Sequence, residues 1–206
     1  MLCRQPHFQL WMFSDAIPGG LLSPCQNGSL FITHRIEQTM ETLYYSRTQS
    51  PIGPLNFAVS GKGLVALEFD RGQFPAAHKP DIAWQESTEK TKPFIHELNE
   101  YFAGQRRDFG FRLDLRGTPF QLQCWRALLD IPYGETRTYA DIARTVGKPQ
   151  AFRAVGMANN RNPIAIVVPC HRVIASDGTL CGYGGGLDLK RKLLELEGAL
   201  TGVLAA

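Results

Sequence analysis

The sequence predicts an α+β protein, with a sheet in the amino-terminal half and mainly helices in the carboxy-terminal half. Two apolar runs around a glycine-containing turn predict a β-hairpin in the first half. Segments with helical spacing of apolar residues, bounded by capping residues and glycines, predict a series of helices in the second half. With 206 residues, 44% of them hydrophobic, the chain can bury a core in one large domain or two small ones.

Composition limits the function classes. The five cysteines are odd in number and irregularly spaced, which indicates a reducing cytosol and no disulfide framework. The net charge of +3 is too small to indicate a nucleic-acid binder by itself. From Arg144 to Arg172, however, five side chains are positive and none is acidic, which is typical of a DNA-facing surface or of a solvated basic face. No segment approaches transmembrane length, so we expect no membrane contact and a cytoplasmic protein.

The first 42 residues show no sustained period of two or of 3.6 residues, so no element is assigned there. Met40 precedes the first well-patterned segment. This suggests the hypothesis that the chain truly starts at Met40 and that the residues before it are a disordered or non-native extension. The cysteines and histidines of this stretch match no zinc pattern, so no metal is expected; they are Cys3, His7, Cys25 and His34.

A first domain is predicted over residues 43–116. Residues 55–69 read as the β-hairpin, and the polar residues 70–92 as a loop. A helix is expected from Pro93 to Gly104, because apolar residues recur at helical spacing between a helix-starting proline and a stopping glycine. Residues 109–115 alternate between apolar and other residues, which predicts a final strand.

A second domain, residues 117–200, is predicted to consist mainly of helices, followed by a tail over residues 201–206. One helix follows Thr118 as N-cap, and a capping-box pattern from Thr138 to Asp141 opens a second, short helix. A third runs from Ala151 to about Asn159 after a glycine-containing turn. Two short helices joined in this way indicate a helix-turn-helix, with an ordinary two-helix packing unit as the alternative.

The helix over residues 151–159 has two different faces. At about 100° per residue, its alanines and Val155 share one face. Residues of the opposite face are Arg153, Gly156, Met157 and Asn160. This face is small and singly charged, so it suits sequence-tolerant binding in the minor groove, with Arg153 as an inserted side chain, better than base readout in the major groove.

The most informative stretch is residues 162–173. An apolar run rich in β-branched residues predicts a buried strand, which ends at Pro169 and presents Cys170 beside His171. A shielded thiol beside an imidazole favours a nucleophilic thiolate, although a buried cysteine is also an ordinary core residue. The last helix, residues 187–197, places Glu197 at the edge of a leucine stripe, either as a partner of His171 or as a rim residue.

Several ordered motifs resemble those of the O6-alkylguanine-DNA alkyltransferases, also called methylated-DNA-protein-cysteine methyltransferases, in their bacterial form. The second half carries Arg153–Gly156, Asn162-Pro163, Pro169–Val173, Tyr183–Gly186 and Leu194–Gly198, and the first half Ser50–Leu55 and Tyr101–Gly104. The resemblance implies a small ribonuclease H-like domain followed by a helical domain with a winged-helix-type helix-turn-helix. It also implies one irreversible, single-turnover transfer of an alkyl group to the protein itself, with no cofactor.

The resemblance also implies a role for each motif residue. Cys170 is the acceptor of an alkyl group from O6 of guanine, with O4 of thymine as a second expected substrate. His171 reaches the thiol through a bound water and is held by Glu197. The remaining implied roles are these: Tyr139 protonates the leaving guanine, Asn162 braces the active-site segment, Arg153 fills the base stack after base flipping, and Val173, Ser176 and Tyr183 wall the pocket.

The implied partner is double-stranded DNA containing O6-alkylguanine, bound by a monomer. DNA contacts are expected from Arg153, Tyr139, Gly156 and Asn160. Met157 and Asn160 are larger than the residues usual in the family, which could alter how closely this helix approaches DNA. Two alternatives stay open: a lesion-binding module without chemistry, and a Cys-His-Glu hydrolase that turns over repeatedly.

Overall fold

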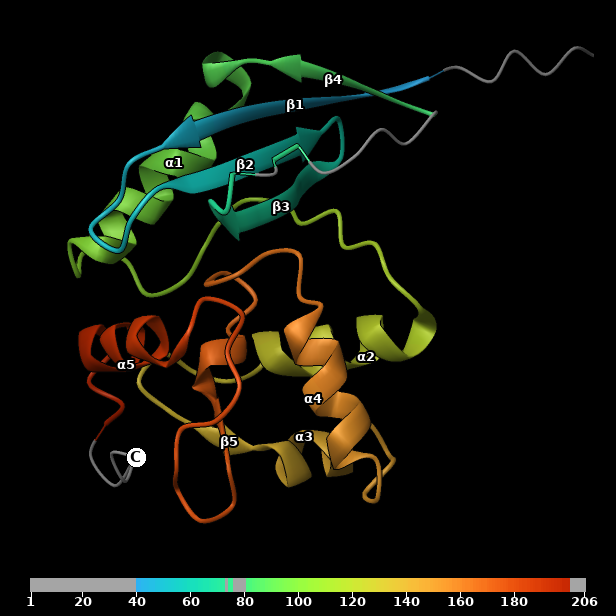
Figure 1. Ribbon diagram of the computed structural model, residues 1–206, viewed down its shortest axis with the longest axis vertical. Helices are drawn as coiled ribbons and strands as arrows, with labels where there is room; N and C mark the ends of the chain where they lie inside the picture. The colour runs from blue at the N-terminus through green and yellow to red at the C-terminus, as the bar shows by residue number, and fades with distance from the viewer. Residues whose placement is uncertain (1–39, 73, 76–80, 201–206) are drawn as a thin grey trace, which may run out of the picture. The chain divides into compact units, whose positions relative to one another are not determined.

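The computed structural model describes residues 40–72, 74–75 and 81–200 (Figure 1). The proposed extension before Met40 and the cysteines and histidines within it lie outside these residues. In this part of the chain no helix is both long and apolar enough to cross a membrane.

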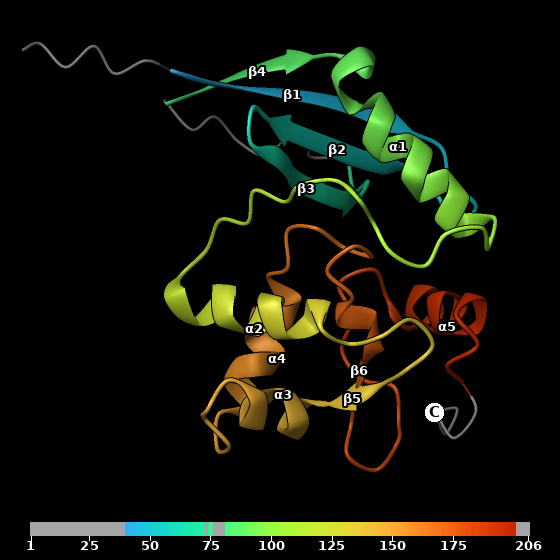
Figure 2. The same cartoon turned by 180° about the vertical axis from the view of Figure 1, so that it is seen from behind.

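The first half is a four-stranded mixed sheet with one helix. Its strands, β1 (Glu41–Thr48), β2 (Leu55–Ser60), β3 (Gly63–Phe69) and β4 (Ile82–Glu86), lie in the order β3-β2-β1-β4. β1 runs parallel to β4, whereas β1–β2 and β2–β3 are antiparallel. Helix α1 (Thr88–Phe102) lies against the sheet, as Figures 1 and 2 show. The predicted hairpin is confirmed as β2 and β3.

The outer edge of β3 is covered by two loop segments of the same chain. Leu64 exchanges backbone hydrogen bonds with residues 112 and 114 at 2.9 and 2.7 Å. Leu67 donates to the carbonyl of Pro163 and accepts from the amide of Ala165, both at 2.9 Å. The edge strand of the sheet therefore fixes the backbone just before the segment that carries Cys170.

The second half contains four α-helices in its described residues. They are α2 (Pro119–Leu129), α3 (Tyr139–Thr145), α4 (Phe152–Asn160) and α5 (Leu187–Leu196), joined by a short parallel pair, β5 (Arg137–Thr138) with β6 (Val173–Ile174), and a 3-10 turn, η1 (Cys170–Arg172). Trp125 of α2 donates its indole hydrogen to the carbonyl of Ala158 in α4 at 2.9 Å, which holds these two helices together.

Local capping signals predicted these helix starts well. The Thr118 hydroxyl accepts from the Gln121 amide while the Gln121 side chain accepts from the Thr118 amide, and Thr138 and Asp141 form the same reciprocal pair. α3 and α4 then form the predicted helix pair, each within one residue of its expected start.

The first half differs from prediction in four places. β1 lies over residues for which the sequence predicts no element, and β4 lies within residues 70–92, which are expected to be a loop. Among the described strands β4 pairs only with β1, and its side chains are half-buried or exposed. Its five residues are too few and too weakly patterned to signal a strand in the sequence. α1 begins at Thr88 with Ser87 as N-cap, and Pro93 lies inside the helix instead of starting it.

The predicted strand over residues 109–115 is also wrong. This segment forms a single bridge, from Leu113 to Leu64, and is otherwise irregular. Its alternation has another cause: Phe109 packs on Tyr101 with ring centroids 5.6 Å apart, and Phe111 packs on Phe94 at 4.8 Å. Alternate side chains face α1, which imitates the period of a strand.

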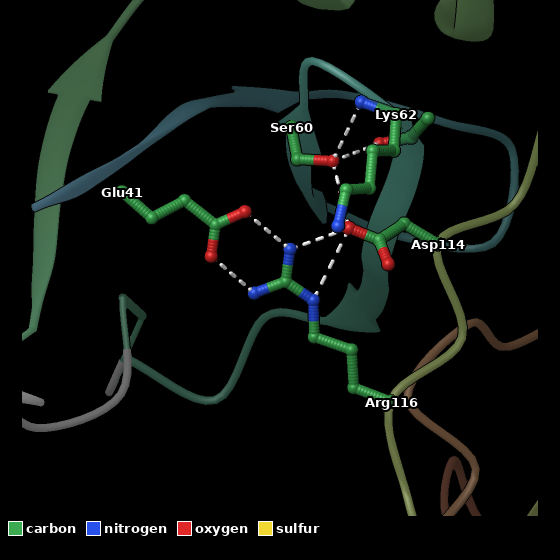
Figure 3. Close-up of polar contacts among 6 residues, drawn as sticks. Glu41, Ser60, Lys62, Asp114 and Arg116 are labelled. Carbon is green, nitrogen blue, oxygen red and sulfur yellow. Dashed lines mark hydrogen bonds and ion pairs between the residues drawn. The ribbon is translucent and has the colours of Figure 1, made fainter. Parts of the chain in front are cut away.

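A polar cluster ties the segment between the two halves to the sheet (Figure 3). Arg116 forms a bidentate ion pair with Glu41 at 2.6 and 2.7 Å and also contacts Asp114. Asp114 in turn accepts from the Ser60 hydroxyl at 2.8 Å. Because Glu41 opens β1 and Ser60 ends β2, the cluster fixes the path of the chain as it leaves the sheet.

Candidate functional site

Cys170 lies at the start of the turn η1 and is 7% exposed. The buried strand predicted to deliver it is not formed. After the bridge between Ile164 and Leu67, the chain makes a tight turn in which the Val167 amide donates to the Ala165 carbonyl at 2.8 Å. Ile166 at the centre of this turn has φ 72°, a left-handed conformation that β-branched residues rarely adopt.

Asn162 explains why this apolar segment is a loop. Its Oδ1 accepts from the Ile164 amide at 3.0 Å, and its Nδ2 donates to the Val168 carbonyl at 2.7 Å. These bonds pull the two ends of the segment together between prolines at positions 163 and 169. The run is apolar because it is buried, and a short apolar run does not by itself distinguish strand from loop. Nδ2 also lies 3.2 Å from the Cys170 sulfur, so Asn162 contacts the thiol directly.

His171 and Glu197 form the expected pair, 3.0 Å apart, and both side chains are buried. Glu197 is not a rim residue. The buried face of α5 and its C-cap consists of Lys190, Leu193, Leu194 and Glu197. The sequence predicts a stripe of Leu189, Leu193, Leu196 and Leu200, of which only Leu193 is fully buried and the other three are half-buried. The real stripe is rotated toward Glu197, which places its carboxylate in the interior.

Three side chains hold the Glu197 carboxylate: His171, Arg172 and Tyr101. Arg172 donates to both oxygens, at 2.8 and 2.9 Å, and the Tyr101 hydroxyl donates to Oε1 at 2.7 Å. Burial alone would raise the pKa of Glu197, but the hydrogen bonds from His171 and Arg172 lower it to about 2. Glu197 is therefore an anion that can only accept hydrogen bonds at neutral pH.

The charge of Glu197 fixes the proton position on His171. Burial lowers the pKa of His171, so the imidazole is neutral at pH 7. Because Nε2 faces an ionised carboxylate, Nε2 carries the hydrogen and Nδ1 is the basic nitrogen. Nδ1 is buried and has no hydrogen-bond partner among the described residues.

The thiol of Cys170 is protonated in this environment. Burial raises its pKa, while the hydrogen bond from Asn162 and the charge of Lys190 act in the opposite direction. Lys190 is itself fully buried and donates to the carbonyls of Val173 and Cys181 at 2.6 and 2.8 Å. These two bonds join α5 to the segment after Cys170.

Cys170 opens into a cavity of about 370 Å³. Cys170, Asn162 and Tyr183 line it, as do Asn159 and the end of β3. Tyr183 packs edge-on against Phe69 of β3 with centroids 5.8 Å apart, so the first half of the chain supplies part of the wall. Two expected wall residues are elsewhere: Val173 is in the core and Ser176 is exposed, and neither lines this cavity.

The outward face of α4 carries exposed side chains of mixed character. Arg153 is exposed and its guanidinium lies 5.8 Å from the ring centroid of Phe152. Phe152 and Met157 are 43% and 60% exposed, and Asn160 is exposed beside them. Ala154, expected on the buried face, is exposed. The basic stretch is also smaller than its sequence indicates, since Arg172 is buried against Glu197.

Tyr139 stands between α4 and the loop after Cys170. Its ring lies 3.7 Å from the position that a Cβ on Gly156 would occupy. Its hydroxyl is within 3.5 Å of the carbonyls of Cys181 and Gly182, and it is not part of the cavity lining. Burial raises the pKa of Tyr139, so its side chain is a neutral phenol.

The chain matches two family models that together cover most of its length. Residues 43–115 match the ribonuclease-like domain of 6-O-methylguanine DNA methyltransferase, and residues 119–199 match its DNA binding domain. The chain belongs to the 6-O-methylguanine DNA methyltransferase family. The predicted membership and the predicted fold, a sheet domain followed by a helical DNA-binding domain, are confirmed.

Members of this methyltransferase family from distant organisms are similar over nearly their whole length. The chain is 50% identical to the methylated-DNA--protein-cysteine methyltransferase of Methanosarcina barkeri, over 75% of this chain and 97% of the relative. A crystal structure of Mycobacterium tuberculosis OGT in complex with DNA is 50% identical, with a TM-score of 0.69 over 76% of this chain and 93% of the other. The O6-methylguanine-DNA methyltransferase of Pyrococcus kodakaraensis is 30% identical, with a TM-score of 0.52 over 76% and 99% of the two chains.

Sequence reasoning missed four residues of this site. Tyr101 comes from the other half of the chain, and no local pattern connects it with Glu197. Lys190 and Asn159 are polar residues on buried faces that were expected to be apolar. Arg172 carried a signal that could have been used, because a charged residue directly after a buried Cys-His pair needs a partner.

Proposed function

We propose that the protein repairs alkylated DNA directly, by one irreversible transfer of an alkyl group from O6 of guanine to Cys170. O4 of thymine is the expected second substrate. The observation that carries the proposal is the placement of the Cys170 thiol in a cavity, 3.2 Å from Asn162 Nδ2 and next in sequence to the buried His171–Glu197 pair. A thiol so placed can meet one atom of a base that enters the cavity.

The proton path follows from the state of each group. The Cys170 thiol, whose pKa is raised by burial, must lose its proton as it attacks. The neutral His171 can accept that proton at Nδ1, through a bridging water, while Glu197 stabilises the imidazolium that forms. The structure contains no direct hydrogen bond between Cys170 and His171, because adjacent residues of a 3-10 turn point in different directions.

The transfer itself forms a sulfur–carbon bond and breaks the bond between the alkyl carbon and O6. The electron pair of the broken bond stays on the guanine, which then needs a proton. Tyr139 is a neutral phenol and is the proposed donor, and the proton taken from the thiol returns to Tyr139 through solvent. The product is a thioether, whose sulfur is a poor leaving group, so each molecule acts once and no cofactor takes part.

The proposed partner is double-stranded DNA, bound in the minor groove without strong sequence preference by a monomer in the cytoplasm. Support comes from α4, whose exposed face offers Arg153 together with apolar side chains and a single amide, Asn160, that could read bases. Arg153 is the side chain proposed to fill the stack when the damaged nucleotide is flipped out. Gly156, Asn160 and Tyr139 are the proposed neighbours of the DNA backbone. We also propose that the boundary between the sheet domain and the helical domain lies between residues 116 and 117.

The proposal is tested by incubating the protein with a duplex that contains O6-methylguanine and measuring the mass of the Cys170 peptide. The expected result is one methyl group per molecule on that peptide and no further turnover. Cys170→Ala should bind the lesion without clearing it. Repair with an unmodified Cys170 peptide would refute the mechanism, and repeated turnover would favour the hydrolase alternative.

A further inference from the structure

Helix α4 exposes more large apolar side chains than any other described element. Among the described residues, such side chains are exposed at five positions: Met40, Leu129, Phe152, Met157 and Leu187. Two of the five belong to α4, which is only nine residues long, whereas α2 and α5 carry one each. A single exposed apolar side chain is ordinary, but a pair on one short helix indicates a surface that another molecule covers.

The two side chains lie on either side of Arg153. The Arg153 guanidinium is 5.8 Å from the ring centroid of Phe152. Met157 follows Arg153 by four residues, which places it one turn further along the same face. At about 100° per residue, Arg153 therefore stands between the two on the helix surface. Neither Phe152 nor Met157 belongs to the core, so packing of the interior does not explain them.

The surroundings of this face favour DNA as the molecule that covers it. α4 lies within the DNA-binding domain of the family, and residues 144–172 contain no acidic side chain that would repel phosphate. An apolar side chain can bond neither to phosphates nor to the polar edges of bases. In the minor groove, apolar side chains instead enter between neighbouring base pairs, separate them and bend the duplex.

We propose that Phe152 and Met157 form an apolar wedge, which enters the minor groove on both sides of Arg153, separates neighbouring base pairs and bends the duplex. The inference rests on the proposed function, because it requires that α4 faces DNA that carries the lesion. It divides base extraction into two steps. The wedge weakens the stack around the damaged nucleotide, and Arg153 then fills the place that the nucleotide leaves.

The wedge and Arg153 differ in how salt affects their contributions to DNA binding. A cation placed among phosphates releases bound counterions, so its contribution falls as the salt concentration rises. An apolar contact releases no counterions, because it neutralises no phosphate. The loss of a wedge side chain should therefore weaken binding by the same factor at each salt concentration.

The test measures binding through methyl transfer. Protein in excess reacts once with a duplex that contains O6-methylguanine, and the half-saturating protein concentration is determined at several salt concentrations. Phe152→Ala and Met157→Ala should each raise this concentration about tenfold, since an apolar side chain no longer leaves water on binding. The factor should be the same at low and at high salt. Met157→Leu, which keeps the apolar volume, should behave as wild type.

Two further variants calibrate the measurement. Arg153→Ala should weaken binding more at low salt than at high salt, because it removes a charge. Leu129→Ala removes a similarly exposed apolar side chain from the end of α2 and should leave the half-saturating concentration unchanged. The bend is measured by energy transfer between dyes at the two ends of an undamaged duplex. Wild type should bend this duplex by at least about 20°, and Met157→Ala should bend it less.

Three results would overturn the inference. Alanine variants that bind as wild type would show that the wedge does not touch DNA, and a duplex that wild type leaves straight would exclude insertion. A wild-type dimer that Met157→Ala dissociates in sedimentation, with duplex binding retained, would assign these side chains to a second copy of the chain. In each case wild type would still methylate Cys170, whereas a wild type that gains no methyl there would refute the proposed function itself.

Discussion

The Tyr101 hydroxyl donates to Oε1 of Glu197 at 2.7 Å, and the same oxygen faces His171 Nε2 at 3.0 Å. Tyr101 belongs to α1 in the first half of the chain, whereas Glu197 follows α5 near its end. The sheet domain thus takes part in orienting the imidazole that is proposed to receive the thiol proton. Tyr101 acts by positioning Glu197 and not by contact with a bound base, since it does not line the cavity.

Tyr101→Phe tests this connection. The variant keeps the ring in its aromatic cluster and removes one hydrogen bond to a charged group, which should cost about 1.5–3 kcal/mol of unfolding free energy. Methyl transfer to Cys170 should slow because Glu197 orients His171 less firmly. Urea unfolding and single-turnover kinetics measure the two effects. Tyr45→Phe is the control, as the ring of Tyr45 packs on Trp84 in the sheet; equal losses in both variants would argue against the role of Tyr101.

The buried carboxylate predicts acid sensitivity. The pKa of Glu197 falls from 4.5 to about 2 in the folded protein, so the stabilisation is fully present above pH 4.5 and is lost as the pH falls toward 2. The shift corresponds to about 3 kcal/mol. Glu197→Gln should be less stable at pH 7 and should show a shallower decline of unfolding free energy between pH 5 and pH 2.5. Parallel curves for the two proteins would contradict the depressed pKa.

The cluster of Figure 3 predicts a change in stability without a change in chemistry. Arg116→Met leaves Glu41 and Asp114 without their shared cation, and the loss of a partly exposed network should cost about 1 kcal/mol. Arg47→Met breaks a single ion pair with Asp70 at a site where Arg47 is 59% exposed, and should cost less. Urea midpoints compare the two variants. A slower methyl transfer in Arg116→Met would show that the cluster reaches the site.

Arg153→Ala should separate base flipping from chemistry. The side chain lies on the exposed face of α4 and does not line the cavity, so reaction with free O6-methylguanine base should be unchanged. Reaction with a duplex should fall by at least about tenfold, because flipping a base without a replacement in the stack costs a few kcal/mol. Arg126→Ala, at an exposed position of α2, is the matched control. Equal losses with base and duplex would remove the flipping role.

Local signals in the sequence predicted the parts of the fold that local bonds determine. Thr118 and Thr138 cap helices with their own neighbours, and the turn between β2 and β3 needs only adjacent residues. The buried strand predicted before Cys170 is instead a loop over residues 162–170, because the backbone path there depends on hydrogen bonds from the Asn162 side chain and on pairing with β3. β4 is not predicted from the sequence because it depends on pairing with β1, which lies about 40 residues earlier in the chain, and not on a pattern of its own.

The candidate site shows the same division. Cys170, His171 and Asn162 are close in sequence, and their motif belongs to the ordered set that carries the family resemblance and so implies the chemistry. The partners that adjust this chemistry come from distant segments. Tyr101 lies 96 residues from Glu197, to which it donates a hydrogen bond, and Lys190 lies 17 residues from Val173, whose carbonyl accepts from it. Such pairs have no period or spacing in the sequence.

The covered edge of β3 has a consequence for solubility. An open strand edge is a template for pairing with a second chain, and here that edge is occupied by the protein's own backbone at Leu64 and Leu67. The opposite end of the sheet is β4, which is short and ends in the exposed Gln85 and Glu86. The hydrogen bonds that fix the approach to Cys170 therefore also protect the sheet against aggregation, and any variant that loosens this loop should be judged by its tendency to self-associate as well as by its activity.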